Sequence, residues 1–67
     1  MIIILNNNHE SFTEEVLTVS QLLKVKKFTF KMLVIKINGQ LVKKTDYEHQ
    51  EIRDGDEVMV LHLVSGG

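Results

Sequence analysis

The chain contains no cysteine, and this absence removes several kinds of site at once. Disulfide bonds and metal sites built on thiolates are excluded, and so is covalent chemistry through a side-chain thiol. Small domains often depend on disulfides or a bound metal, so this chain of 67 residues must be held by regular secondary structure around a thin core. Hydrophobic residues make up 43% of the chain, which is enough for such a core. The lack of cysteine also agrees with a reducing compartment.

Long apolar runs and an excess of charge of one sign are absent as well. The opening run Ile2–Leu5 stops at Asn6, so it is too short to span a membrane or to form the apolar part of a signal peptide. We therefore expect a cytoplasmic protein with no membrane association. Eight basic and nine acidic residues give a net charge of −1, whereas nucleic-acid-binding proteins normally carry a basic excess. The composition thus argues against nucleic acid as a partner.

The first residues predict a β-hairpin. Ile2–Leu5 is apolar without polar alternation, which indicates a strand covered on both faces. Asn6–Asn8 is a turn signal, since asparagine tolerates left-handed backbone angles. We expect the chain to return as a second strand over Glu10–Thr13, with Phe12 directed toward the core.

A helix is predicted to follow the hairpin. Thr18 and Gln21 are spaced as in a capping box, in which each side chain accepts a hydrogen bond from a backbone amide of the first turn. Apolar residues then recur at helical spacing, at Val19, Leu22 and Leu23. The lysines that come next suit the negative end of the helix dipole, and we expect the helix to end near Lys27 or Phe28.

A second hairpin is predicted after the helix. In Leu33–Asn38 one side of the alternation carries only apolar residues: Leu33, Ile35 and Ile37. The other side carries Val34, Lys36 and Asn38, so the segment indicates a half-buried strand. Asn38–Gly39 is a strong hairpin signal, and Leu41–Val42 begins the return strand.

The remaining residues complete an α+β pattern. Thr45–Ile52 is polar and irregular, which indicates a loop with a helical turn around Tyr47. A tight turn at Asp54–Asp56 leads to a last strand over Glu57–Val64. This order of elements indicates a β-grasp, a mixed four- to five-stranded sheet with one main helix packed on one face and the two apolar end strands in the centre. We expect one β-grasp domain over residues 1–64 and a flexible C-terminal tail over residues 65–67.

Four short motifs carry a resemblance to a known family. They are Thr18–Leu23 at the helix start, Ile37–Gly39 at the end of the third strand, Asp54–Val58 before the last strand, and the terminal Gly66–Gly67. In this order and spacing, the whole chain resembles the ThiS family of ubiquitin-like sulfur carriers of thiamine biosynthesis. These carriers are related to MoaD, the small subunit of molybdopterin synthase. The chain departs from the family in lacking proline and in having Lys43–Lys44 where members often have Pro-Arg.

The resemblance implies a carrier on which partner enzymes act, and not an enzyme. In the family, an ATP-dependent adenylating enzyme of the ThiF type activates the C-terminal carboxylate, here that of Gly67, as an acyl-adenylate. The adenylate is converted to a thiocarboxylate, which donates sulfur to an acceptor enzyme, a thiazole synthase of the ThiG type. Gly66 and Ser65 would complete the tail. The carrier itself would bind no cofactor, since the partner enzymes use the ATP and the sulfur donor.

The Gly66–Gly67 end suits this chemistry for a physical reason. Glycine has no Cβ, so it passes through a narrow channel and leaves the acyl carbon open to attack. A terminal glycine pair also occurs by chance, as a frayed end. Two other functions use the same end, that of a molybdopterin-synthase small subunit and that of a ubiquitin-like protein modifier. The short chain favours the thiamine branch by resemblance.

A partner-binding surface is predicted on one face of the sheet. We expect four residues of the first and last strands to face the helix: Ile3, Leu5, Val58 and Val60. The residues beside them then face the other way, namely Ile2, Ile4, Met59, Leu61 and Leu63. An open sheet face normally carries polar residues, so an apolar one indicates a protein interface. In the alternative, Phe28, Phe30 or the loop around Tyr47 folds over this face.

Other residue groups give weaker hypotheses. His9, His49 and His62 lie far apart in sequence without a second ligand at metal-binding spacing, so no metal site is predicted. The basic stretch Lys24–Lys36 has phenylalanines among its lysines, a combination that can stack bases and neutralise phosphates. A nucleic-acid or protein binding module is therefore the competing hypothesis, and the nearly balanced charge argues against its nucleic-acid form.

Overall fold

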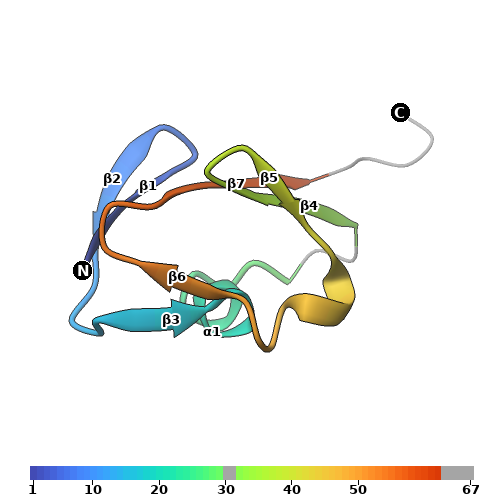
Figure 1. Cartoon of the computed structure of the whole chain (residues 1–67), viewed down its shortest axis with the longest axis horizontal. Helices are drawn as coiled ribbons and strands as arrows, with labels where there is room; N and C mark the ends of the chain where they lie inside the picture. Colours follow the sequence, from blue (N-terminus) through green and yellow to red (C-terminus); the bar gives the residue numbers. More distant parts are fainter. Residues whose placement is uncertain (30–31, 63–67) are drawn as a thin grey trace.

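The structure is a computed structural model that describes residues 1–29 and 32–62. Its strands are β1 (Ile2–Leu5), β2 (Asn8–Ser11), β3 (Val16–Thr18), β4 (Leu33–Ile37), β5 (Gln40–Val42), β6 (Glu51–Arg53) and β7 (Glu57–His62). The helix α1 spans Val19–Val25, and a 3-10 turn, η1, spans Lys44–Asp46. A five-stranded sheet in the order β2-β1-β7-β4-β5 lies over a second layer, which holds α1 and the two-stranded sheet β3-β6 (Figure 1).

The strands from the two ends of the sequence lie side by side inside the sheet. β1 and β7 are parallel, with Ile4 opposite Glu57 and Leu5 opposite Val58. β2 pairs antiparallel with β1, and β4 pairs antiparallel with β7. The predicted α+β class and ubiquitin-like β-grasp are confirmed, with the apolar end strands inside the sheet and the short hairpin strands at its edges.

Two tight turns fix the register of the hairpins. Asn6 and Asn7 have φ angles of 49° and 69°, and Asn38 and Gly39 have φ angles of 50° and 82°. Two successive positive φ angles are typical of the type I′ turn, whose twist matches that of paired strands. Because the first turn uses only two residues, β2 begins at Asn8 and not at Glu10 as expected.

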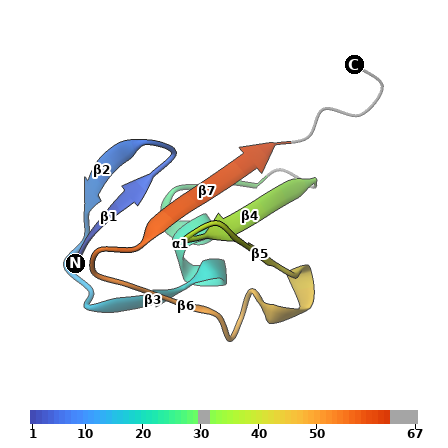
Figure 2. The ribbon, with the colours of Figure 1, turned by 45° about the horizontal axis from the view of Figure 1, so that its top comes forward.

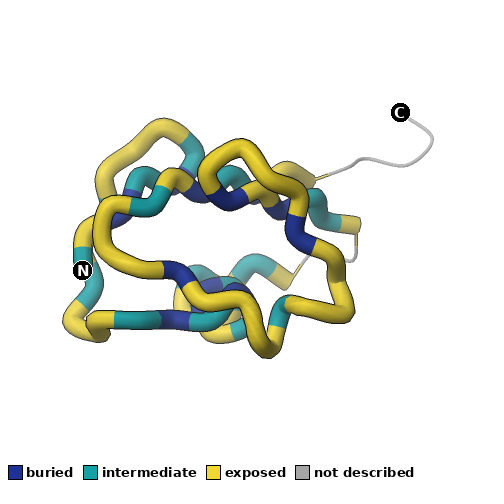
Figure 3. The backbone as a smooth tube through the Cα atoms, viewed as in Figure 1, coloured by how far each residue is buried: buried dark blue, intermediate teal, exposed yellow. Residues whose placement is uncertain are grey.

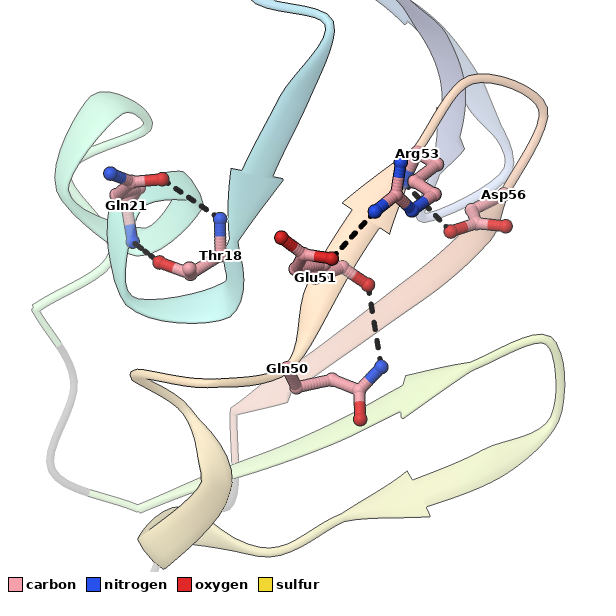
Figure 4. Close-up of polar contacts among 6 residues, drawn as sticks. All are labelled: Thr18, Gln21, Gln50, Glu51, Arg53 and Asp56. Atoms are coloured by element: carbon pink, nitrogen blue, oxygen red, sulfur yellow. Dashed lines mark hydrogen bonds and ion pairs between the residues drawn. The ribbon is translucent and has the colours of Figure 1, made fainter.

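The predicted start of the helix is confirmed. The Gln21 amide donates to Thr18 Oγ1 at 3.2 Å, and the Thr18 amide donates to Gln21 Oε1 at 2.9 Å, which completes the capping box (Figure 4).

The helix ends earlier than expected, at Val25. Lys27 has a left-handed φ of 58°, and the amide of Phe28 donates to the carbonyl of Leu23 at 2.8 Å. The Lys27 amide donates to the Lys24 carbonyl at 3.1 Å. Together these bonds form a Schellman motif, which reverses the chain. The position that usually holds glycine is occupied here by lysine, so the sequence carries no stop signal there.

Two short strands, β3 and β6, lie where the sequence pattern indicates none. They pair antiparallel, with Leu17 opposite Ile52, and both of these side chains are buried. Three residues are too few to show an alternating pattern, and the two partners lie far apart in sequence. The expected loop over Thr45–Ile52 is therefore corrected: its helical turn is η1, just before Tyr47, and its end begins β6.

The core lies between the two layers. The sheet contributes Ile3, Leu5, Ile35, Ile37, Val42, Val58 and Val60, and the second layer contributes Leu17, Val19, Leu22 and Ile52. Figure 3 shows that buried residues alternate with more exposed ones along the strands of the sheet. The four residues of β1 and β7 that were expected to face the helix side are all buried, so this expectation is confirmed.

The turn at Asp54–Asp56 ties the start of β7 to its neighbours. One oxygen of the Asp56 carboxylate accepts a hydrogen bond from the Arg53 amide at 2.9 Å (Figure 4), and the other accepts one from Asn38 Nδ2 at 3.1 Å. The Ile2 amide donates to Asp54 Oδ1 at 2.7 Å. The turn therefore joins β1, β6 and the β4–β5 hairpin at one end of the sheet.

Replacing Lys27 by glycine is expected to stabilise the fold by about 1 kcal/mol, because glycine adopts a positive φ without a Cβ clash. The midpoint of urea unfolding measures the change. Lys27→Ala is the matched control, since it removes the same charge but keeps a Cβ, and its midpoint should stay close to that of the wild type. Equal midpoints for the two variants would show that the backbone at Lys27 is not strained.

Candidate functional site

One face of the five-stranded sheet points away from α1 and is largely apolar. Residues opposite each other in paired strands share a face. Val34 lies opposite Leu61, and Lys36 lies opposite both Met59 and Leu41. On β1, β7, β4 and β5 this face, here called the open face, carries Ile2, Ile4, Val34, Lys36, Leu41, Glu57, Met59 and Leu61. Figure 2 shows these strands side by side, with α1 beneath β7 and β4.

Several apolar side chains of the open face are in contact with solvent. Ile2, Leu41 and Leu61 expose 53%, 64% and 42% of their surface, whereas Ile4, Val34 and Met59 are half-buried. Scattered exposed apolar residues are ordinary, but a contiguous group on one sheet face is typical of a protein interface. The open face is therefore the strongest candidate for a partner-binding surface in the described residues.

The structure brings together four of the residues proposed for this surface: Ile2, Ile4, Met59 and Leu61. The others, Leu63 on the face and Ser65, Gly66 and Gly67 in the tail, lie outside the described residues. Val34 and Leu41 belong to the open face and were not among the proposed residues. Both follow from sequence signals, because Val34 alternates with the buried residues of β4. The Asn38–Gly39 turn then places Leu41 opposite Lys36.

The side chains that were considered as covers for the open face lie elsewhere. Phe28 and Tyr47 pack against the buried core. Phe30 lies outside the described residues. Within residues 1–29 and 32–62, the open face therefore keeps its exposed apolar side chains.

Asn6 anchors the strand that leads to the tail. Its amide donates to the Val58 carbonyl at 2.9 Å, and its Oδ1 accepts a hydrogen bond from the Val60 amide at 2.8 Å. These bonds extend the contact between β1 and β7 beyond the last paired residue of β1. On the other side, β4 pairs with β7 as far as His62, which lies opposite Leu33. β7 is thus held by β1 and Asn6 as far as Val60 on one side and by β4 as far as His62 on the other.

An open hollow of about 620 Å³ lies between the end of α1 and the β4–β5 hairpin. Its wall is mainly apolar, with residues such as Leu23, Phe28 and Leu33, and its polar side chains come from Thr29, Lys44 and Tyr47. Burial raises the pKa of the Tyr47 phenol, so this hydroxyl stays protonated at neutral pH.

The described residues offer no metal site and no membrane-spanning helix. Among residues 1–29 and 32–62, no three His, Asp or Glu side chains lie close enough to hold a metal ion. Asp54 and Asp56, considered above for a turn, use their carboxylates to accept hydrogen bonds from the backbone amides of Ile2 and Arg53. In the same ranges, no helix has the length and the apolar character needed to cross a bilayer.

Comparison with known proteins identifies the family. The profile of the ThiS family matches residues 3–67, which is nearly the whole chain. The chain belongs to the ThiS family. A comparison with curated protein sequences found no match.

Solved structures of a ThiS protein share this fold over the full length of the present chain. The crystal structure of the thiamine biosynthesis protein ThiS from Geobacter metallireducens is 25% identical in sequence, covers 100% of both chains, and has a TM-score of 0.90. The solution structure of a thiamine biosynthesis protein from the same organism is also 25% identical. It covers 100% of this chain and 88% of the other, with a TM-score of 0.81. The ThiS fold thus accounts for every described element of this chain.

The open face of this ThiS-family chain is expected to tolerate a charge that the core does not. Leu61→Asp should change the free energy of unfolding by no more than about 1 kcal/mol, because Leu61 is on the surface. Val60→Asp, one residue away and 8% exposed, should cost more than about 3 kcal/mol and unfold much of so small a domain. Urea unfolding followed by circular dichroism compares the two. A larger loss for Leu61→Asp would show that the faces of β7 are assigned the wrong way round.

Proposed function

We propose that this chain is a sulfur carrier in thiamine biosynthesis and that the carboxylate of Gly67 is its working group. The observation that carries the proposal is membership of the ThiS family over residues 3–67, a range that includes the terminal Gly66–Gly67. The similarity to a thiamine biosynthesis protein at a TM-score of 0.90 supports the same pathway. The lack of any cysteine fits this role, because the sulfur then travels on the main-chain end of the protein.

Each step of the proposed chemistry acts on the terminal carboxyl group. The Gly67 carboxylate attacks the α-phosphate of ATP on a ThiF-like adenylating enzyme, which releases pyrophosphate and leaves an acyl-adenylate. A sulfur donor then supplies a sulfide equivalent that displaces AMP, so a C–S bond forms as the C–O bond to AMP breaks. A ThiG-like thiazole synthase receives the sulfur from the resulting thiocarboxylate. The carrier supplies no catalytic side chain, and the ATP and the sulfur donor belong to the partner enzymes.

The number of residues after His62 limits where these enzymes can dock. Residues 63–67 follow the last described residue of β7, and five residues span at most about 17 Å when fully extended. An enzyme that works on Gly67 therefore has to contact the domain close to the end of β7. Leu61 and Val34 are the open-face residues nearest to that end, because they lie one position before the last pair of β4 and β7.

The open face is accordingly proposed as the docking surface for both enzymes, used in turn. Its apolar residues Ile2, Ile4, Met59 and Leu61 were proposed from the sequence, with Leu63 as a fifth. Val34 and Leu41 extend the same surface over β4 and β5. Sequential use of one surface means that the carrier must leave the adenylating enzyme before it delivers its sulfur.

Two other functions would use the same C-terminal end. A molybdopterin-synthase small subunit would donate the thiocarboxylate sulfur to a pterin precursor, and a ubiquitin-like modifier would transfer its acyl group to a lysine amine. Both begin with the same adenylation. A protein modifier differs from a sulfur carrier in the nucleophile that attacks the acyl group, and the two carriers differ in the acceptor of the sulfur. The match to the ThiS family favours the thiamine pathway over both.

The proposed chemistry predicts a defined mass change. After incubation with ATP, the cognate adenylating enzyme and a sulfur donor, the intact protein should gain the mass that replaces one oxygen by sulfur, and fragmentation should place it on Gly67. A chain that lacks Gly67 is the control and should stay unchanged. An unchanged wild-type mass, with an enzyme that thiolates its own known carrier, would contradict the proposal.

If the open face is the docking surface, a charge placed on it should lower the affinity for the adenylating enzyme without changing the fold. Leu61→Asp should raise the KM of the adenylating enzyme for the carrier about tenfold or more, because a carboxylate would be buried among apolar groups at the interface. Val25→Asp is the matched control, since Val25 is an apolar residue of α1 with 52% of its surface exposed and lies outside the open face. If the two variants have the same KM, the enzyme docks elsewhere.

A further inference from the structure

The charges on the open face are unevenly distributed. The β4–β5 hairpin and the two residues after it contain three lysines, Lys36, Lys43 and Lys44, and no Asp or Glu lies between residues 32 and 45. The carboxylate of this face, Glu57, lies at the other end beside Ile4. The half of the open face formed by β4 and β5 is therefore basic.

Lys36 lies among the apolar residues of that half. It is exposed, and its neighbours across the paired strands are Met59 on one side and Leu41 on the other. Lys43 follows β5 in an extended conformation, with φ −74° and ψ 147°. Since side chains alternate along an extended chain, Lys43 lies on the same side as Leu41, with the buried Val42 between them.

The described part of the chain gives these two lysines no carboxylate partner. Its ion pairs join Lys26 to Glu10 and Arg53 to Glu51, at 2.9 and 2.7 Å, and neither involves the β4–β5 hairpin. A partner that covers Leu41 and Met59 must also cover Lys36. Removing an ammonium group from water costs several kcal/mol unless an opposite charge meets it. A carboxylate opposite Lys36 on the covering surface would offset this cost and favour such a partner over one without it.

We propose that Lys36, assisted by Lys43, selects the adenylating enzyme. The docking surface of that enzyme then has an apolar centre, and carboxylates beside this centre face the β4–β5 hairpin. This inference rests on the proposed function. A protein surface fits better than nucleic acid, because the described aromatic residues Phe12, Phe28 and Tyr47 all pack against the core. None of these rings is placed on the open face to stack on a base.

Charge reversal on the hairpin tests the inference. The assay is ATP–pyrophosphate exchange by the organism's own carrier-adenylating enzyme, with the carrier as the varied substrate. Lys36→Glu should raise KM about tenfold or more with little change in kcat, and Lys43→Glu should raise it about threefold, because a charge at the edge of an interface is better solvated. Lys36→Arg should restore a KM close to that of the wild type.

A matched variant separates the effect on KM of where the charge lies from the effect of the net charge. Lys24→Glu makes the same change on an exposed residue of α1, and its KM should stay within about twofold of the wild type. Raising the salt from about 0.05 to about 0.5 M should increase the wild-type KM and should have little effect on the KM of Lys36→Glu. Urea unfolding of each variant checks that the fold is kept.

Failure of the inference and failure of the proposed function give different results. If the wild type is adenylated and Lys36→Glu matches Lys24→Glu in both KM and salt dependence, the inference is wrong and the proposed function stands. If the wild type is not adenylated at all, both are wrong. Binding of a labelled single-stranded DNA by the wild type that is lost in Lys36→Glu would overturn the inference in favour of nucleic acid. A wild-type dimer that dissociates in Lys36→Glu, seen by sedimentation, would overturn it in favour of a second copy of the chain.

Discussion

The fold depends on the parallel pairing of its first and last strands. β1 and β7 meet inside the sheet, where the Ile4 amide donates to the Asp56 carbonyl at 3.0 Å and the Asn6 side chain continues the contact to Val60. Parallel strands cannot be joined by a tight turn, and the long connection between them includes α1 and the β3-β6 sheet, which cover one face of the sheet. The same pairing, continued by Asn6, holds β7 as far as Val60, and among the described residues the opposite face of the sheet stays open.

This arrangement suits a protein whose chemistry takes place at its C-terminal carboxylate. Because only five residues follow His62, the proposed chemistry at Gly67 requires recognition and reaction at the same end of the domain. In the proposed function the open face supplies the recognition, with an apolar centre over β7 and β4 and a basic half around Lys36. The domain would thus provide affinity and selectivity, while the enzymes that bind it provide all the catalytic groups. Such a division needs no reactive side chain in the carrier, in agreement with the absence of cysteine.

Sequence patterns predicted the parts of the fold that depend on local chemistry. The capping box of Thr18 and Gln21, the Asn38–Gly39 turn and the period-two burial of β7 each have a cause within a few residues. β3 and β6 were missed because three residues give no period and their pairing is a tertiary contact. The helix end was misplaced because Lys27, and not glycine, adopts the left-handed angle. Leu41 was missed although the register of the hairpin already placed it on the open face.

The proposed function requires the open face and the C-terminal residues to form one interface with the adenylating enzyme. Backbone amide spectra of the isotope-labelled carrier, recorded with and without the unlabelled enzyme, test it residue by residue. Signals of β1, β4, β5 and β7, including those of Val34, Lys36 and Leu61, are expected to shift or broaden, while those of α1 stay unchanged. Changes confined to α1 and the β3-β6 sheet would contradict it, because that layer lies on the far side of the core.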